Sequence, residues 1–171
     1  MSFDIGSALL GAIASGLVQA VMAHFDRKRE SESILVAIAS EVDSICRLIQ
    51  HQGYLDATSK IAQDIDKGMW NGVSYIIDIR SNYFTVFEGL VSKLGHLKPQ
   101  QANQIVNFYA YCKSTIDSTR PDGPHALEPN SAEAALNMVS VSLLLRSVLS
   151  LGGEIVKLPK KPILRAEMIT P

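Results

Sequence analysis

The feature that most constrains this chain is an uncharged stretch, Ile5 to Phe25, that stops at the charge cluster of residues 26–30. As an α-helix it would be roughly 31 Å long, close to the ~30 Å hydrocarbon thickness of a bilayer. No Gly or Pro interrupts the chain from Leu17 to Gln52. The pattern therefore predicts one continuous helix of about 45 residues, a length that usually projects from a small protein or pairs with a second copy.

A cleavable signal peptide is an alternative for the uncharged stretch, but it needs a basic region ahead of the apolar run. Residues 1–4 contain no Lys or Arg, whereas Arg27, Lys28 and Arg29 follow the run directly. By the positive-inside bias, these basic residues keep the chain after Phe25 in the cytoplasm. The sequence therefore favours a membrane anchor whose N-terminus crosses outward.

Small residues recur every four positions within this stretch. Ser7, Gly11 and Ser15 form one strip, and Ala8, Ala12, Gly16 and Ala20 form the strip beside it. Small residues four apart let two helix backbones approach closely, especially in membranes. The strip predicts self-association, either in a bilayer or in a soluble oligomer whose N-terminal helices bury each other. Burial in the core of a monomer is the third alternative.

The second half of the long helix is amphipathic. Its apolar positions follow a three-four spacing: Leu35, Ile38, Val42, Ile45 and Ile49. The opposite, exposed side is expected to carry Glu32, Glu41, Asp43 and Arg47. Such a face either packs on the rest of the chain or pairs with a second copy.

The remaining chain predicts further helices separated by short loops. We expect helices over Leu55–Lys67 with Gly68 as terminator, from Asn82 to Gly95, from Pro99 to near Arg120, and from a Ser131 cap to Gly152-Gly153. Residues 69–80 are expected to be helix or loop. The last helix is apolar on most sides, which indicates the central core helix. The predicted fold is all-α: an antiparallel bundle of four or five helices with one long protruding N-terminal helix.

Three segments follow from this pattern. Residues 1–30 form the hydrophobic helix with its basic flank, residues 31–158 the helical bundle, and residues 159–171 an extended tail with Pro159, Pro162 and Pro171.

Three blocks resemble a known group of proteins: Asn82-Tyr83-Phe84-Thr85-Val86-Phe87-Glu88, Leu94-Gly95-His96-Leu97-Lys98-Pro99 and Ile105-Val106-Asn107-Phe108-Tyr109. They are similar to small bacterial and mobile-element proteins of unassigned function, which combine an N-terminal hydrophobic helix with an all-helical domain. The resemblance implies an anchored helical domain and no activity. Lys98 departs from the pattern, in which a small or apolar residue is expected.

The sequence offers no pattern typical of catalysis, metal binding or phosphate binding. His24, His51, His96 and His125 have no ligand spacing, and Gly152-Gly153 follows a helix instead of opening one. Cys46 and Cys112 are predicted to be buried reduced thiols, with a disulfide between them as the alternative. We therefore expect a non-enzymatic protein without catalytic residues, cofactor or metal. With a net charge of −1 it is not expected to bind nucleic acid.

Aromatic residues in the middle of the chain, Tyr83, Phe84, Phe87, Phe108, Tyr109 and Tyr111, are expected in the core. Trp70, flanked by Gly68 and Gly72, is the candidate for contact with a protein partner.

Three functional hypotheses remain. The first is a bacterial inner-membrane protein with a cytoplasmic helical domain that serves interaction or scaffolding and self-associates through Ser7, Gly11 and Ser15. The second is a soluble, cytoplasmic homo-oligomer that pairs along Leu35, Ile38, Val42, Ile45 and Ile49. The third is a small membrane-active effector.

Overall fold

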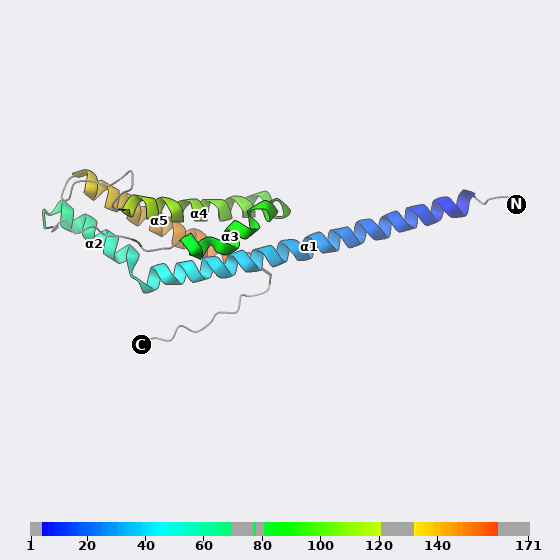
Figure 1. Cartoon of the computed structure of the whole chain (residues 1–171), viewed down its shortest axis with the longest axis horizontal. Coiled ribbons are helices and arrows are strands. Elements are labelled where there is room, and N and C mark those ends of the chain that lie inside the picture. Colours follow the sequence, from blue (N-terminus) through cyan, green and yellow to red (C-terminus); the bar gives the residue numbers. More distant parts are fainter. Residues whose placement is uncertain (1–4, 70–76, 78–80, 121–131, 161–171) are drawn as a thin grey trace.

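A computed structural model of the protein describes residues 5–69, 77, 81–120 and 132–160, with the backbone alone described for 5–18, 20, 81 and 82 (Figure 1). The helices are α1 (Ile5–His51), α2 (Tyr54–Asp66), α3 (Thr85–Leu90), α4 (Pro99–Thr119) and α5 (Ala132–Ile155), with 3₁₀ segments η1 (Ser81–Phe84) and η2 (Val91–His96). These residues contain helices and no strand, which confirms the all-α prediction. The segment 69–80 and the Ser131 cap fall largely outside the described residues.

Helix α1 runs without interruption from the uncharged stretch into the bundle (Figure 1). With its 47 residues it is about 70 Å long. Its first half projects away from the other helices, and its second half packs against α2, α3 and α5. The single long, protruding helix is therefore confirmed. Gly53 follows its end with a φ of 63°, in the left-handed region that favours glycine.

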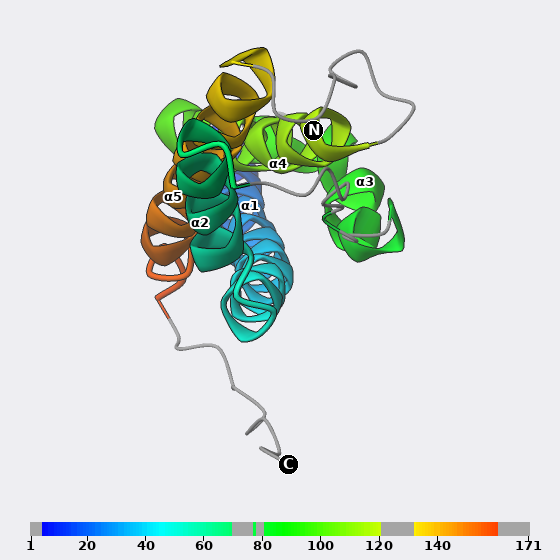
Figure 2. The same cartoon turned by 90° about the vertical axis from the view of Figure 1, so that its left-hand side faces the viewer.

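Helix α5 is the common neighbour of α1, α2 and α4. Helices α2 and α4 both pack along it, and α5 also contacts the second half of α1 (Figure 2). Helix α4 begins at Pro99, as predicted, and the side chain of Gln101 accepts a hydrogen bond from the Lys98 N–H at 3.2 Å. Gly68 follows α2 with a φ of 65°, which confirms it as terminator.

The core lies between the second half of α1 and helices α4 and α5. It contains Ile38, Val42, Ile105, Phe108, Val141, Leu145 and Val148, each fully buried. Tyr109 stacks on Phe87 with a centroid distance of 3.9 Å and meets Phe84 edge-on at 5.6 Å. The aromatic core is confirmed for Phe84, Phe108 and Tyr109, whereas Tyr83 and Tyr111 are exposed.

The prediction that α1 carries four exposed charged residues on one side needs correction. Asp43 is buried, and Glu32, Glu41 and Arg47 are half-buried. Glu41 turns towards α3 and α4, because it is hydrogen-bonded to both helices.

Three further expectations need correction. The segment from Asn82 to Gly95 is divided into η1, α3 and η2 instead of one helix. Helix α5 continues through Gly152 and Gly153 instead of ending there. Gly152 lies where α5 packs closely on α1, since a Cβ at this position would overlap the Cys46 sulfur and lie 3.2 Å from the Phe108 ring. Helix α5 is central only along one side, since Leu136 and Leu143 remain exposed.

Candidate functional site

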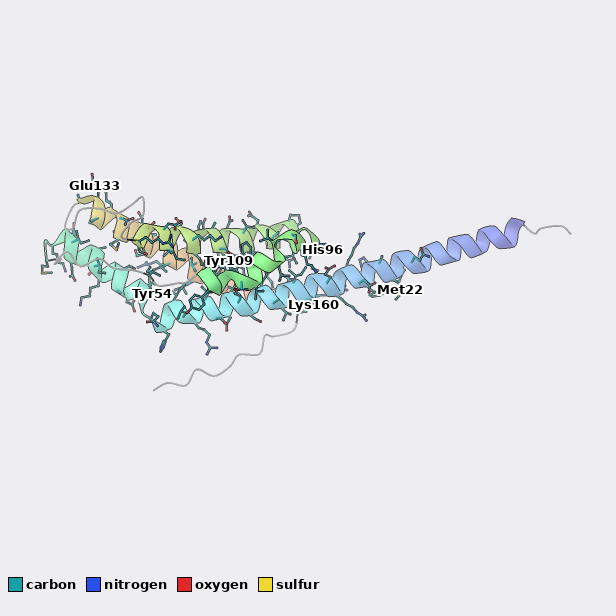
Figure 3. All side chains as sticks on the ribbon, viewed as in Figure 1. Met22, Tyr54, His96, Tyr109, Glu133 and Lys160 are labelled. Carbon is teal, nitrogen blue, oxygen red and sulfur yellow. The ribbon has the colours of Figure 1, made fainter. Side chains whose placement is uncertain are left out.

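The end of the bundle from which α1 departs brings together segments that are far apart in the sequence. Figure 3 places His96, which ends η2, and Lys160, which follows α5, beside α1, with Met22 further out on the projecting half. Helix α4 also begins here, three residues after His96. This end is therefore where the projecting helix, the bundle and the chain after α5 meet.

Two carboxylates of α1 hold this end together. Glu30 accepts a 3.2 Å contact from Lys93 Nζ on one oxygen, and its other oxygen lies 3.0 Å from His96 Nδ1. Glu32 accepts a hydrogen bond of 2.6 Å from the backbone N–H of Lys160. These contacts fasten η2 and the chain after α5 to α1 just where α1 leaves the bundle. At partly exposed positions, each stabilises the fold by less than about 1 kcal/mol.

Basic side chains gather at this end. The predicted flank of Arg27, Lys28 and Arg29 is exposed on α1. The fold adds exposed lysines from three other segments, and we call the whole set the basic collar: Arg27, Lys28, Arg29, Lys93, Lys98, Lys157 and Lys160. Lys98 lies two residues after His96, and Lys157 three residues before Lys160, and His96 and Lys160 both contact α1. The nearby acids Asp26, Glu30, Glu32 and Glu154 are fewer.

A groove of about 630 Å³ lies within the collar. It is lined by Phe25, Lys28, Arg29, Glu32, Ser33, Val36, Ala37 and Lys160. Phe25, Val36 and Ala37 make part of it apolar, and Lys28, Arg29 and Lys160 supply positive charge. Phe25 is 52% exposed, so this groove continues onto the apolar surface of the projecting half.

The predicted self-association residues divide into two groups. Ser7, Gly11, Ala12, Ser15 and Gly16 lie on the projecting half of α1, and their side-chain surroundings fall outside the described residues. The pairing face of Leu35, Ile38, Val42, Ile45 and Ile49 is buried in the core of the same chain, with exposures of 4% or less. Within this chain that face is therefore covered by the chain's own helices. Trp70 lies outside the described residues.

Glu41 is a half-buried polar junction that sequence reasoning missed. It accepts hydrogen bonds from the Val86 and Phe87 N–H groups at 2.7 and 3.1 Å and from the Tyr109 hydroxyl at 2.6 Å. Burial, followed by the Glu41 hydrogen bond, raises the pKa of Tyr109, so this phenol remains a donor. The junction joins α1, α3 and α4. Glu41 lies three residues after Ile38 and four before Ile45, so the sequence already places it on the apolar face of α1, and this spacing could have predicted its contact with the bundle.

The two cysteines are free and lie within the core, as predicted, with Cys112 buried and Cys46 half-buried. Burial, followed by the charge of Asp43, raises the pKa of Cys46 to about 12. Burial likewise raises the pKa of Cys112. Both remain protonated at neutral pH, which makes them poor nucleophiles.

Among the residues whose side chains the structure describes, which leaves out most of Ile5–Phe25, α5 is the one helix long and apolar enough to cross a membrane by length and composition. Its inner side contacts the core through Val141, Leu145 and Val148, but only 22% of its apolar 18-residue window is buried. Its outer side exposes Leu136, Val139 and Leu143. Of these, Leu136 and Val139 line a second groove of about 350 Å³ beside α2.

The site contains no group suited to metal: the described residues hold no cluster of three or more His, Cys, Asp or Glu placed around one ion. His24, His51 and His96 are exposed, and His96 contacts Glu30. Comparison with protein-family models, curated proteins and solved structures finds no match to this chain. Its function is therefore argued from its own residues.

Proposed function

We propose that this protein is a non-enzymatic, membrane-anchored helical protein. Residues 5–25 of α1 would hold a cytoplasmic bundle at the bacterial inner membrane, where the bundle serves interaction or scaffolding. One observation carries the proposal: the uncharged half of α1 projects from the bundle (Figure 1). On this half Val21, Met22 and Phe25 are 51%, 58% and 52% exposed. A large apolar side chain gains about 1.5–3 kcal/mol on full burial, which favours a lipid environment for this half.

The continuity of α1 adds a second argument. The helix that would enter the bilayer is the same helix whose residues Ile38 and Val42 are fully buried in the core. No Gly or Pro lies between them and Leu17, so no flexible hinge separates anchor from bundle. Such a continuous helix would fix the orientation of the bundle relative to the membrane, as a scaffold requires.

Fractionation of cells that express the full chain tests the anchor. We expect the protein in the membrane pellet after high-speed centrifugation without detergent. Ile13→Asp, within the uncharged stretch, should release it, because a carboxylate at the centre of a span costs roughly 2.5–3.5 kcal/mol. Leu143→Asp is the matched control on the exposed side of α5 and should remain in the pellet.

Two results would contradict the proposal. A full-length protein in the supernatant would remove the anchor. Release by Leu143→Asp but not by Ile13→Asp would make α5, and not α1, the helix that holds the protein in the membrane.

Self-association of the projecting half is part of the proposal. The small residues Ser7, Gly11 and Ser15 recur one turn apart on α1, a spacing that favours close helix contact. We expect Gly11→Ile to reduce the oligomer mass measured by light scattering in mild detergent, with Ile13→Leu, which keeps the side-chain volume, as the control that should leave it unchanged. A soluble, detergent-free oligomer with the same response would instead support the homo-oligomer in which these helices bury each other.

A membrane-active effector is the remaining candidate, in which the small-residue strip of Ser7, Gly11 and Ser15 assembles the N-terminal helices into an oligomer that permeabilises the membrane. In this case expression of the full chain should slow growth, and expression from Ser31 onward should not. Equal growth would exclude an effector.

A further inference from the structure

The basic collar is assembled by the fold from four separate segments. Arg27, Lys28 and Arg29 come from α1, Lys93 from η2, Lys98 from the start of α4, and Lys157 and Lys160 from the chain after α5. The other end of the bundle, where α2 lies in Figure 1, carries Asp56, Asp64 and Asp66 beside Lys60 and Lys67. Positive charge is therefore concentrated at the end from which the uncharged half of α1 departs.

The acids at this end cancel only part of the charge, since Asp26, Glu30, Glu32 and Glu154 stand against seven basic side chains. Glu30 is shared by Lys93 and His96, and Glu32 accepts the Lys160 backbone N–H. The side chains of Lys28, Arg29 and Lys160 remain at the groove. A ligand that meets this surface would therefore find cationic side chains beside the apolar Phe25, Val36 and Ala37.

The collar lies at the depth of a membrane surface if Ile5–Phe25 spans the bilayer. At ~1.5 Å per residue, Glu30 is about 7.5 Å and Glu32 about 10 Å beyond Phe25 along the axis. Lys93, His96 and Lys160 contact these two carboxylates. They would therefore lie within roughly one Debye length, ~10 Å at 0.1 M salt, of the headgroups.

We propose that the basic collar binds the headgroups of anionic phospholipids, with the groove between α1 and Lys160 taking one lipid. This inference rests on the proposed membrane anchor and specifies its partner. Lys28, Arg29 and Lys160 contact the lipid phosphate, and Phe25, which lies on the membrane side of them along α1, contacts its carbon chain. The bundle then lies against the inner surface of the membrane, held at two places, by the anchor and by the collar.

The test uses the full chain in lipid vesicles of phosphatidylcholine alone or mixed with phosphatidylglycerol. Flotation measures membrane attachment. In the same samples, brief acetylation followed by mass spectrometry measures the accessibility of each lysine. We expect flotation with both lipids, but slower acetylation of Lys93, Lys98, Lys157 and Lys160 with phosphatidylglycerol only. Lys60, Lys67 and Lys113 lie outside the collar and serve as internal references. High salt should abolish the protection, because the attraction is electrostatic.

A matched pair of variants separates local charge from total charge. Lys98→Gln/Lys157→Gln/Lys160→Gln should remove the protection of Lys93, since each basic residue near an anionic surface changes its binding about fivefold. Lys60→Gln/Lys67→Gln/Lys113→Gln removes the same charge elsewhere and should retain the protection. All six side chains are exposed, so neither variant disturbs the core.

Each outcome decides the inference. Flotation with both lipids but equal acetylation would overturn the collar and leave the anchor. Flotation only with phosphatidylglycerol, reversed by salt, would support the collar and remove the anchor. No flotation with either lipid would overturn both. Equal loss of protection in the two triple variants would overturn a localised collar, because total charge would then explain the effect.

Discussion

The first half of α1 (residues 5–29) and its second half (residues 30–51) belong to one helix, yet the chain surrounds only one of them. Ile38 and Val42 are fully buried by α4, α5 and the aromatic residues around Tyr109, whereas Val21, Met22 and Phe25 project from the bundle. Both halves are rich in apolar residues. The difference teaches that an apolar helix face does not identify its own partner: the second half is covered within the chain, whereas the described apolar side chains of the first half are not.

Deletion of the first half tests this comparison most strongly. A fragment from Ser31 to Lys160 retains every buried residue of the core, so we expect it to fold as a soluble helical domain. It should move completely from the membrane pellet to the supernatant. Circular dichroism and a urea melt should show a helical, cooperative transition. An aggregated or unfolded fragment would mean that the first half belongs to the core.

Truncation of one side chain in each half should have very different effects. Ile38→Ala removes a fully buried side chain and should lower the free energy of unfolding by about 2–5 kcal/mol. Val21→Ala, at a side chain that is 51% exposed, should change it by less than about 0.5 kcal/mol. Urea unfolding of the full chain in mild detergent measures both. Similar losses would show that the first half is covered by protein.

The carboxylate of Glu41 should contribute more to the free energy of unfolding than that of Glu32, although both lie on the second half of α1. Glu41→Ala removes three hydrogen bonds and leaves the buried Tyr109 hydroxyl without its acceptor. We expect a loss of about 2–4 kcal/mol. Glu32→Ala removes the bond from the Lys160 N–H at an exposed position and should cost less than about 1 kcal/mol.

A second variant keeps the Glu41 comparison decisive. In the background of Tyr109→Phe, Glu41→Ala should cost less, because no hydroxyl is then left unpaired. Equal costs in the two backgrounds would mean that the Glu41–Tyr109 bond contributes nothing to stability.

Two neighbouring glycines test how closely α5 approaches the second half of α1. Gly152→Ala places a Cβ against Cys46 and Phe108 and should destabilise the fold by about 1–3 kcal/mol. At Gly153 a Cβ meets no atom within 4 Å, so Gly153→Ala should stabilise the helix by about 0.5–1 kcal/mol. Thermal melts of the two variants should shift in opposite directions. A shift in the same direction would contradict the close approach.

Alkaline pH should lower the free energy of unfolding through two thiols of the core, Cys46 on α1 and Cys112 on α4. Burial raises the pKa of Cys46 from 9.0 to about 12, and that of Cys112 in the same direction. Stability is therefore fully present below pH 9 and is lost as the pH rises from 9 towards 12. We expect each thiol to contribute a decrease of about 1 kcal/mol by pH 10. Cys46→Ala/Cys112→Ala should decrease less over the same range, and an identical slope would exclude the thiols.

Local patterns in the sequence determined much of this protein. The three-four spacing of Ile38, Val42 and Ile45 marked the core face of α1, Pro99 marked the start of α4, and Gly68 the end of α2. These features depend on residues within a few turns of each other, so periodicity and backbone preference are enough to predict them. The absence of Gly and Pro after Leu17 likewise predicted one continuous helix.

Contacts between distant residues decided the rest. Glu41 and Tyr109 are 68 positions apart, Glu30 and Lys93 are 63 apart, and Glu32 and Lys160 are 128 apart. Gly152 reads locally as a stop, but in the fold it makes room for Cys46. The sequence located the apolar stretch and its basic flank. Only the tertiary structure covered the second half of α1 and brought four segments into one collar, because burial and charge density depend on which helices pack together.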